Sequence, residues 1–180
     1  MTDQKVATSP RSRARMTGAL YLLYFLTAIS AETFVGRGHL VVYDAVNLIA
    51  HALYIAVTLL FYHLFKPTNR SLSLVAACFS LGGCANDVLD LLNLAPYKIS
   101  SLVFFAPYCL LLGYLIFRST FLPRFLGVLM TLAGVGWLIF LSPLEHPLSI
   151  YLKVLGFVAE LSLCLWLLVM GVNTHPARVD

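Results

Sequence analysis

The stretch Gly82–Asn93, GGCANDVLDLLN, decides how the rest of the chain must be arranged. It lies near the end of an apolar run that begins at Leu72, and four polar residues interrupt that run: Asn86, Asp87, Asp90 and Asn93. In a helix, three of these residues follow an i, i+4, i+7 spacing and share one face, with Asp87 on its flank. Carboxylates inside a membrane normally face a protein interior or a water-filled cavity, so we expect other helices to supply them with partners.

The composition is that of a polytopic membrane protein. Of the 180 residues, 60% are hydrophobic and 11% are charged, and the mean hydropathy is +0.87. A soluble domain is nearer half apolar and about a quarter charged. The formal net charge of +4 does not indicate nucleic-acid binding. The basic residues lie between apolar runs, and no basic patch is interleaved with aromatic residues.

Six apolar runs have about the 20 residues that a bilayer-spanning helix requires, allowing for tilt. In order they are Thr17–Val35, Leu40–Phe65, Leu72–Asn93, Ile99–Phe117, Phe125–Leu141 and Leu148–Val172. We therefore predict an all-α fold, a polytopic bundle of six transmembrane helices in residues 16–173. Residues 1–15 are expected to form a disordered polar arm, and residues 174–180 a polar tail. Pro107 is expected to kink or break the fourth run.

The basic residues predict the topology. With the N-terminus inside, nine of the twelve Lys and Arg residues fall in cytoplasmic segments, and three fall outside. The positive-inside rule then places both termini in the cytoplasm. An alternative is that Arg11–Arg15, Leu20–Ile29 and the small residues Ala28–Ala31 form a cleaved signal peptide. The apolar run continues past Glu32, which favours a retained helix.

The acidic residues follow the opposite pattern, because five of the eight fall within the predicted helices: Glu32, Asp44, Asp87, Asp90 and Glu160. A rise of about 1.5 Å per residue puts Glu32, Asn47 and Asn86 at about 8–10 Å below the outer face. The same reckoning puts His51 and Glu160 close to the midplane. We therefore expect four helices to contribute to one polar layer in the outer half of the bilayer.

The second apolar run presents Asp44, Asn47 and His51 at i, i+3, i+7, again on one face. A hairpin with the third run brings this face against the polar residues of Gly82–Asn93. His51 beside a desolvated carboxylate is a proton donor–acceptor pair suited to acid–base chemistry. Tyr54, one turn further on, either lines the same cavity or packs in the core. A network that only holds the helices together, at about 1 kcal/mol per bond, is the simpler alternative, but five ionisable groups favour function.

The sequence indicates neither a metal site nor a cofactor. Zinc sites usually recruit more His or Cys than one intramembrane histidine, and His63, twelve residues after His51, lies near the other helix face. The four cysteines lack Cys-x-x-Cys spacing and are expected to be packing residues. No phosphate loop or nucleotide motif is present.

The fifth apolar run offers a surface of small residues. Gly127, Thr131 and Gly134 follow an i, i+4, i+7 spacing on one helix face. Small residues let two helix backbones approach closely. This face is expected to pack either within the bundle or between protomers of a homo-oligomer.

Three segments resemble a bacterial family of small six-helix membrane proteins, catalogued as domain of unknown function forty-three eighty-six. They are RMTGALYLLYFLTAIS (Arg15–Ser30), LGYLIFRSTFLPRFLGVLMTLAGVGWL (Leu112–Leu138) and ELSLCLWLLVMGVN (Glu160–Asn173). The RS-x-FLPR-x-LG and WLL-x-x-GVN runs are the more specific parts. The resemblance implies a six-helix protein of the bacterial cytoplasmic membrane, with Glu160 part of the family pattern. It implies no activity, substrate or cofactor.

These observations favour an intramembrane enzyme that performs acid–base chemistry on a membrane-dissolved lipid or isoprenoid. In this interpretation Asp87 and Asp90 supply acid and base, His51 relays a proton, and Glu32 and Glu160 tune them. The residues expected to line the ligand cavity are Asp44, Asn47, Asn86, Asn93 and Tyr54. Two alternatives stay open: a proton- or cation-coupled carrier of a small solute, with Pro107 breaking a helix, and a non-catalytic subunit of another membrane protein.

Overall fold

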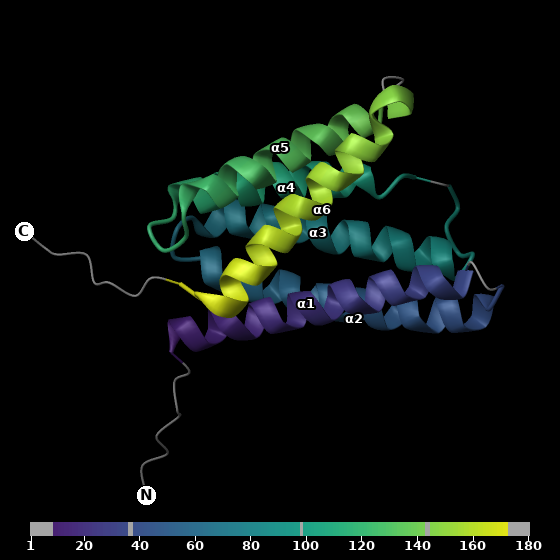
Figure 1. The fold of residues 1–180 in the computed structure, drawn as a ribbon, viewed down its shortest axis with the longest axis horizontal. Coiled ribbons are helices and arrows are strands. Elements are labelled where there is room, and N and C mark those ends of the chain that lie inside the picture. Colours follow the sequence, from purple (N-terminus) through teal and green to yellow (C-terminus); the bar gives the residue numbers. More distant parts are fainter. Residues whose placement is uncertain (1–8, 36–37, 98, 143–144, 173–180) are drawn as a thin grey trace, which may run out of the picture.

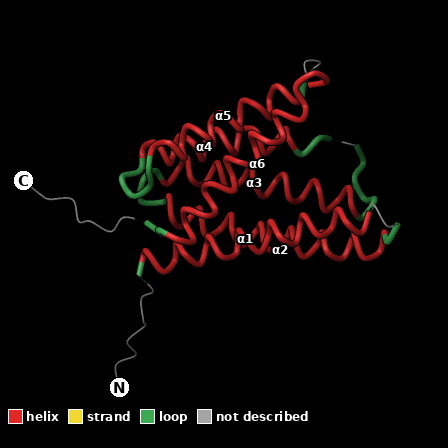
Figure 2. The backbone as a smooth tube through the Cα atoms, viewed as in Figure 1, coloured by secondary structure: helices red, strands yellow, loops and turns green. Residues whose placement is uncertain are grey.

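The computed structural model describes residues 9–35, 38–97, 99–142 and 145–172, and within these ranges the chain forms six α-helices and no strand (Figures 1 and 2). The helices are α1 (Pro10–Val35), α2 (Leu40–Phe65), α3 (Arg70–Leu91), α4 (Leu102–Arg118), α5 (Arg124–Phe140) and α6 (Glu145–Val169). The all-α fold and the number of helices predicted from the sequence are confirmed.

Four of the helices, α1, α2, α3 and α6, are long and apolar enough to cross a membrane. Helices α4 and α5 are also apolar, but each has 17 residues. At a rise of about 1.5 Å per residue they span about 25 Å, less than the roughly 30 Å of a bilayer's hydrocarbon core. The chain is thus a membrane-type helical protein. The placement of both termini in the cytoplasm stays a prediction.

The helices are arranged as a ring. Each packs against its neighbours in sequence, and α6 packs back against α1. In Figure 1, α6 crosses the other helices diagonally and ends beside the beginning of α1. The Arg15 guanidinium accordingly donates a 3.0 Å hydrogen bond to the Val169 backbone oxygen. We call this end of the ring the termini end, and the opposite end, where α3 connects to α4, the far end.

Helix α1 begins at Pro10, seven residues before Thr17, the first residue of the predicted run. Ser9 explains the earlier start, because its hydroxyl oxygen accepts a 3.2 Å hydrogen bond from the Ser12 backbone N–H. Pro10 then occupies the first helical position, where its missing N–H costs nothing. Residues 10–15 of the expected disordered arm are therefore helical.

Helix α6 ends at Val169, three positions before the predicted end at Val172. Gly171 follows with a φ of +70°, a left-handed conformation that favours glycine. Its N–H donates a 3.1 Å hydrogen bond to the Trp166 carbonyl, which caps the last turn. Helix α2, in contrast, has the predicted bounds.

Glycines bring α4 and α5 into backbone contact. A Cβ atom at Gly113 of α4 would lie 2.8 Å from the Gly127 carbonyl oxygen, and a Cβ atom at Gly127 would lie 2.8 Å from the Gly113 oxygen. A Cβ at Gly134 would lie 2.9 Å from the Leu110 backbone nitrogen. The small-residue face predicted on this helix therefore packs within the bundle. A homo-oligomer stays a prediction.

The surface and the core of the ring are both apolar. Large apolar side chains face outward on every helix, for example Leu26, Val41, Leu74, Phe117, Phe125 and Val154. Buried residues from α1 to α6 join in one core that includes Tyr21, Leu112, Met130 and Leu163. An apolar exterior of this kind suits contact with lipid, and it leaves the polar side chains described next as the exceptions that need an explanation.

Candidate functional site

The centre of the polar region is a contact between α2 and α3. His51 Nε2 lies 3.3 Å from Asp87 Oδ2, and the two side chains are 19% and 34% exposed. His51 lies near the middle of α2, whereas Asp87 is one turn from the end of α3. The pair therefore lies in the half of the ring nearer the far end. The hairpin of α2 and α3 brings these two predicted site residues together.

Both ring nitrogens of His51 face an oxygen. Nδ1 lies 2.8 Å from the Asn47 carbonyl oxygen, which can only accept, so Nδ1 carries a proton. Nε2 faces the Asp87 carboxylate, so one more proton must lie between His51 and Asp87. It belongs either to an imidazolium beside a carboxylate or to a carboxyl group beside a neutral imidazole. The geometry thus describes a pair that holds one shared proton.

Helix α4 holds the other side of the Asp87 carboxylate. Ser101, the residue immediately before α4, donates its hydroxyl hydrogen to Asp87 Oδ1. The Asn86 side-chain amide donates to Ser101 Oγ at 3.1 Å and to the Ile99 carbonyl oxygen at 2.9 Å. These bonds fix the carboxylate and tie the end of α3 to the approach to α4. We call His51, Asp87, Ser101 and Asn86 the polar cluster.

Glu160 forms a second and separate centre between α6 and α1. Its Oε2 accepts a 2.8 Å hydrogen bond from the hydroxyl of Tyr21, which is buried. Within the described ranges, no Lys, Arg or His side chain forms an ion pair with Glu160. A carboxyl group in an apolar bundle without a cation favours its neutral form. Glu160 is therefore suited to hold a proton of its own.

Tyrosines occupy the space between the two centres. Tyr54 of α2 lies one turn beyond His51 and is buried. Its ring centroid lies 4.7 Å from that of Tyr24 and 6.1 Å from that of Tyr21, the partner of Glu160. Tyr108 of α4 packs edge to face on Tyr54 at 6.4 Å. These rings form a layer contributed by three helices.

Within the described ranges, the side chains of the other predicted site residues, Glu32, Asp44, Asn47, Asp90 and Asn93, make no hydrogen bond to His51, Asp87 or Glu160. Glu32, Asp90 and Asn93 are exposed, and Asn93 follows the end of α3 in a left-handed conformation, with a φ of +55°. The partly buried Asn47 donates its amide to the Tyr43 carbonyl of its own helix at 3.0 Å, and Asp44 is also partly buried. The expected layer of five acids is therefore divided, with Asp87 and Glu160 turned inward. The catalytic and binding roles assigned to these residues stay predictions.

The sequence predicts no functional role for Ser101 or Tyr21, although both contact a predicted site residue. Ser101 falls inside the predicted run Ile99–Phe117, whereas the structure places it just before α4. Serine before a helix is a common cap, and tyrosine is common in membrane helices, so neither residue signals a function by itself. A usable signal for Ser101 is its polar side chain at the start of the fourth apolar run, which follows the acid-bearing end of the third run.

The polar cluster offers one carboxylate, one imidazole and hydroxyl and amide groups, which suit a polar head group that donates hydrogen bonds. Within the described ranges, no three His, Cys, Asp or Glu side chains lie close enough together to hold a metal ion. The chemistry that this set of side chains supports directly is proton transfer.

The family model described as "Domain of unknown function (DUF4386)" matches residues 89–171, from the last turns of α3 to just beyond α6. This range contains Ser101 and Glu160, whereas His51 and Asp87 precede it. An uncharacterized protein of Archaeoglobus fulgidus is 26% identical over 125 residues, which are 65% of this chain and 76% of that protein. No solved structure matches the chain. The chain is therefore similar to the DUF4386 family over residues 89–171.

Proposed function

We propose that this membrane protein carries out acid–base chemistry at the His51–Asp87 pair on a lipophilic molecule, a lipid or isoprenoid, that reaches the pair from the bilayer. The observation that carries the proposal is the position of the His51 ring, because both of its nitrogens face oxygen atoms and one of these belongs to Asp87. A pair that already shares a proton can donate it to a bound molecule and take it back.

The surroundings of the pair support this assignment. Ser101 donates to the other Asp87 oxygen, so it orients the carboxylate and leaves Oδ2 for the proton. Asn86 in turn positions Ser101. Exposures of 19% for His51 and 34% for Asp87 leave room for a molecule to approach from outside the bundle. Asp90 and Glu32 face outward and receive no part in the proposal.

A second candidate, a proton-coupled carrier, is favoured by Glu160. Its hydrogen bond to Tyr21 lies in the middle stretch of α1 and α6. Protonatable acids near the midplane are typical of coupled transport. The expected break at Pro107 is missing, however, because α4 runs without interruption from Leu102 to Arg118. We therefore place the carrier second.

The test compares the wild type with Asp87→Asn, after extraction in mild detergent and native mass spectrometry for retained lipids. Asp90→Asn is the matched control, since it makes the same change three residues further along α3, at an exposed position. We expect a retained lipid or isoprenoid in the wild type and in Asp90→Asn, and its loss in Asp87→Asn. The same lipids retained by all three proteins would refute the assignment of Asp87.

A further inference from the structure

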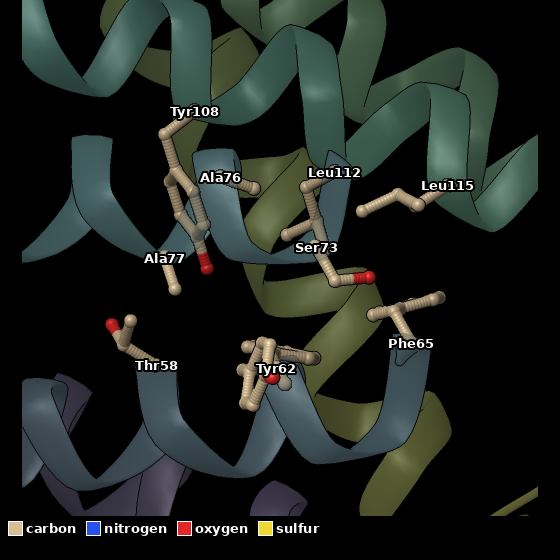
Figure 3. A pocket seen from close by; sticks show the side chains of 10 residues that line it. Thr58, Tyr62, Phe65, Ser73, Ala76, Ala77, Tyr108, Leu112 and Leu115 are labelled. Carbon is tan, nitrogen blue, oxygen red and sulfur yellow. The ribbon is translucent and has the colours of Figure 1, made fainter. Parts of the chain in front are cut away.

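A small cavity lies between α2, α3 and α4, on the termini side of the polar cluster. Figure 3 shows Tyr108 reaching from α4 toward it, with Thr58 and Tyr62 rising from α2. Ser73 of α3 also lines it, and Leu112 is among the apolar residues that complete the wall. The space open to the centre of a water-sized sphere is about 10 Å³. This is about the room that one water molecule needs.

The Tyr108 hydroxyl points into this region (Figure 3). It is buried, and no described residue makes a hydrogen bond of ordinary geometry with it, although the Tyr54 ring packs against the Tyr108 ring. A buried hydroxyl without a hydrogen bond costs about 1–3 kcal/mol. A water molecule in the cavity, which Thr58, Tyr62 and Ser73 also line, removes that cost.

Thr58 differs from the other threonines of the bundle. Thr17, Thr27 and Thr131 donate to backbone carbonyls of their own helices. Thr58 Oγ1 instead lies 2.6 Å from Ser80 Oγ of α3, and either oxygen can be the donor in this buried pair. A hydroxyl pair that can reverse its direction can pass a proton either way.

These groups belong to a polar seam along the facing sides of α2 and α3. On α2, the residues His51, Tyr54, Thr58 and Tyr62 recur every three or four positions and share one face. On α3, the spacing of Asp87, Ser80 and Ser73 is also helical, and the buried thiol of Cys84 lies between the first two. The polar seam consists of these residues and Tyr108.

The polar seam reaches the termini end of the ring. Ser73 lies in the first turn of α3 and donates a 2.7 Å hydrogen bond to the carbonyl of Asn69, which is exposed. At its other end the seam begins at His51 and Asp87, which are partly exposed and lie in the half of the ring nearer the far end. The α4–α5 contact contrasts with it, because that contact is made by glycines and has no facing hydroxyl pair among the described residues.

We propose that the cavity binds one internal water molecule, and that this water makes the polar seam a proton path between the His51–Asp87 pair and the termini end. The path rests on the proposed function, since it supplies the proton that the pair exchanges. Only O–H, N–H and S–H bonds are made or broken along it. Each polar group of the seam accepts a proton from one neighbour and releases a proton to the next. The hydroxyl groups then rotate back, which restores the starting state.

The test measures proton flux into liposomes that contain the full-length protein and a pH-sensitive dye, with a potassium gradient and valinomycin to set the potential. We expect the wild type to admit protons faster than protein-free liposomes. Tyr108→Phe and Thr58→Val, which remove one hydroxyl each at nearly constant volume, should each lower this flux about tenfold, because a missing hydrogen-bonded station raises the barrier. Tyr114→Phe, the same change at an exposed position of α4, should leave it unchanged.

Two results would overturn the path: a wild-type flux equal to that of protein-free liposomes, or equal fluxes for the wild type, Tyr108→Phe and Thr58→Val. The lipid-retention test of Asp87 has a separate readout. Proton flux without lipid retention would support the proton path and contradict the proposed acid–base chemistry. Lipid retention without proton flux would support the acid–base chemistry and contradict the proton path. A variant that fails to fold is recognised by lost helical circular dichroism, and the remaining variant then decides.

Discussion

Tyr21 of α1 donates a 2.8 Å hydrogen bond to Glu160 of α6, a residue 139 positions later in the chain. This bond joins the first and last helices where they close the ring. It is the one hydrogen bond that the described residues give to the Glu160 carboxyl group, and it leaves that group without a cationic partner. The pair therefore contributes to stability and at the same time keeps a protonatable group inside an apolar bundle.

We predict that Tyr21→Phe destabilises the protein by about 1–2 kcal/mol, because the Glu160 carboxyl group loses the one donor that the described residues give it. Glu160→Gln should cost less, since the amide oxygen still accepts from Tyr21. Unfolding followed by circular dichroism in detergent measures both variants. A Tyr21→Phe protein as stable as the wild type would show that the hydrogen bond does not stabilise the bundle.

Removing the Ser101 hydroxyl should weaken the polar cluster without unfolding the protein. A hydrogen bond to a charged group contributes about 1.5–3 kcal/mol, so Ser101→Ala should reduce the affinity for the retained lipid roughly tenfold or more. Lipid exchange followed by native mass spectrometry checks this. Ser100→Ala is the control, because Ser100 is an exposed neighbour that supplies only its backbone oxygen to the start of α4. Equal losses in both variants would exclude a specific role of Ser101.

The glycine contacts predict a clear difference between two alanine substitutions. Gly113→Ala should destabilise the fold by several kcal/mol or prevent folding, because its Cβ would meet the α5 backbone at 2.8 Å. Gly136→Ala places its Cβ 3.5 Å from Leu152, which is an ordinary contact. It should be neutral or stabilising by about 0.5–1 kcal/mol through helix propensity. Thermal unfolding in detergent gives both values, and comparable stability for the two variants would contradict the close α4–α5 packing.

Thiol reactivity offers a test of the helix orientations. Of the four cysteines, Cys78 is exposed and the other three, Cys84, Cys109 and Cys164, are buried. A small membrane-permeant maleimide should therefore modify one thiol in the folded protein and four after denaturation in dodecyl sulfate. Mass spectrometry counts the adducts, and Cys78→Ser should abolish the native labelling. Rapid modification of Cys84 would place the polar seam outside the core.

The apolar runs predict the number of helices well, because each run contains enough apolar residues for one helix. The first and last residues of the helices depend on single residues that a hydropathy average does not detect, such as Ser9 with its hydroxyl and Gly171 with its left-handed backbone. Periodicity also places His51 on the face of α2 that meets α3. It does not give the rotation of each helix about its own axis, so it could not separate the inward Asp87 from the outward Asp90 three residues later. Ser101 and Tyr21 matter through contacts distant in sequence, which no local pattern contains.

The closure of the ring by α6 has a consequence for how the protein is made. During synthesis α1 leaves the ribosome first, and its partner α6 follows last. Until then the Tyr21 hydroxyl has no Glu160 to bind, and a carboxyl group entering the membrane costs about 2.5–3.5 kcal/mol on insertion scales. The last helix is therefore inserted most favourably beside the first. A nascent chain that stops before Glu160 exposes the inner face of α1 to lipid or to the quality-control machinery of the membrane.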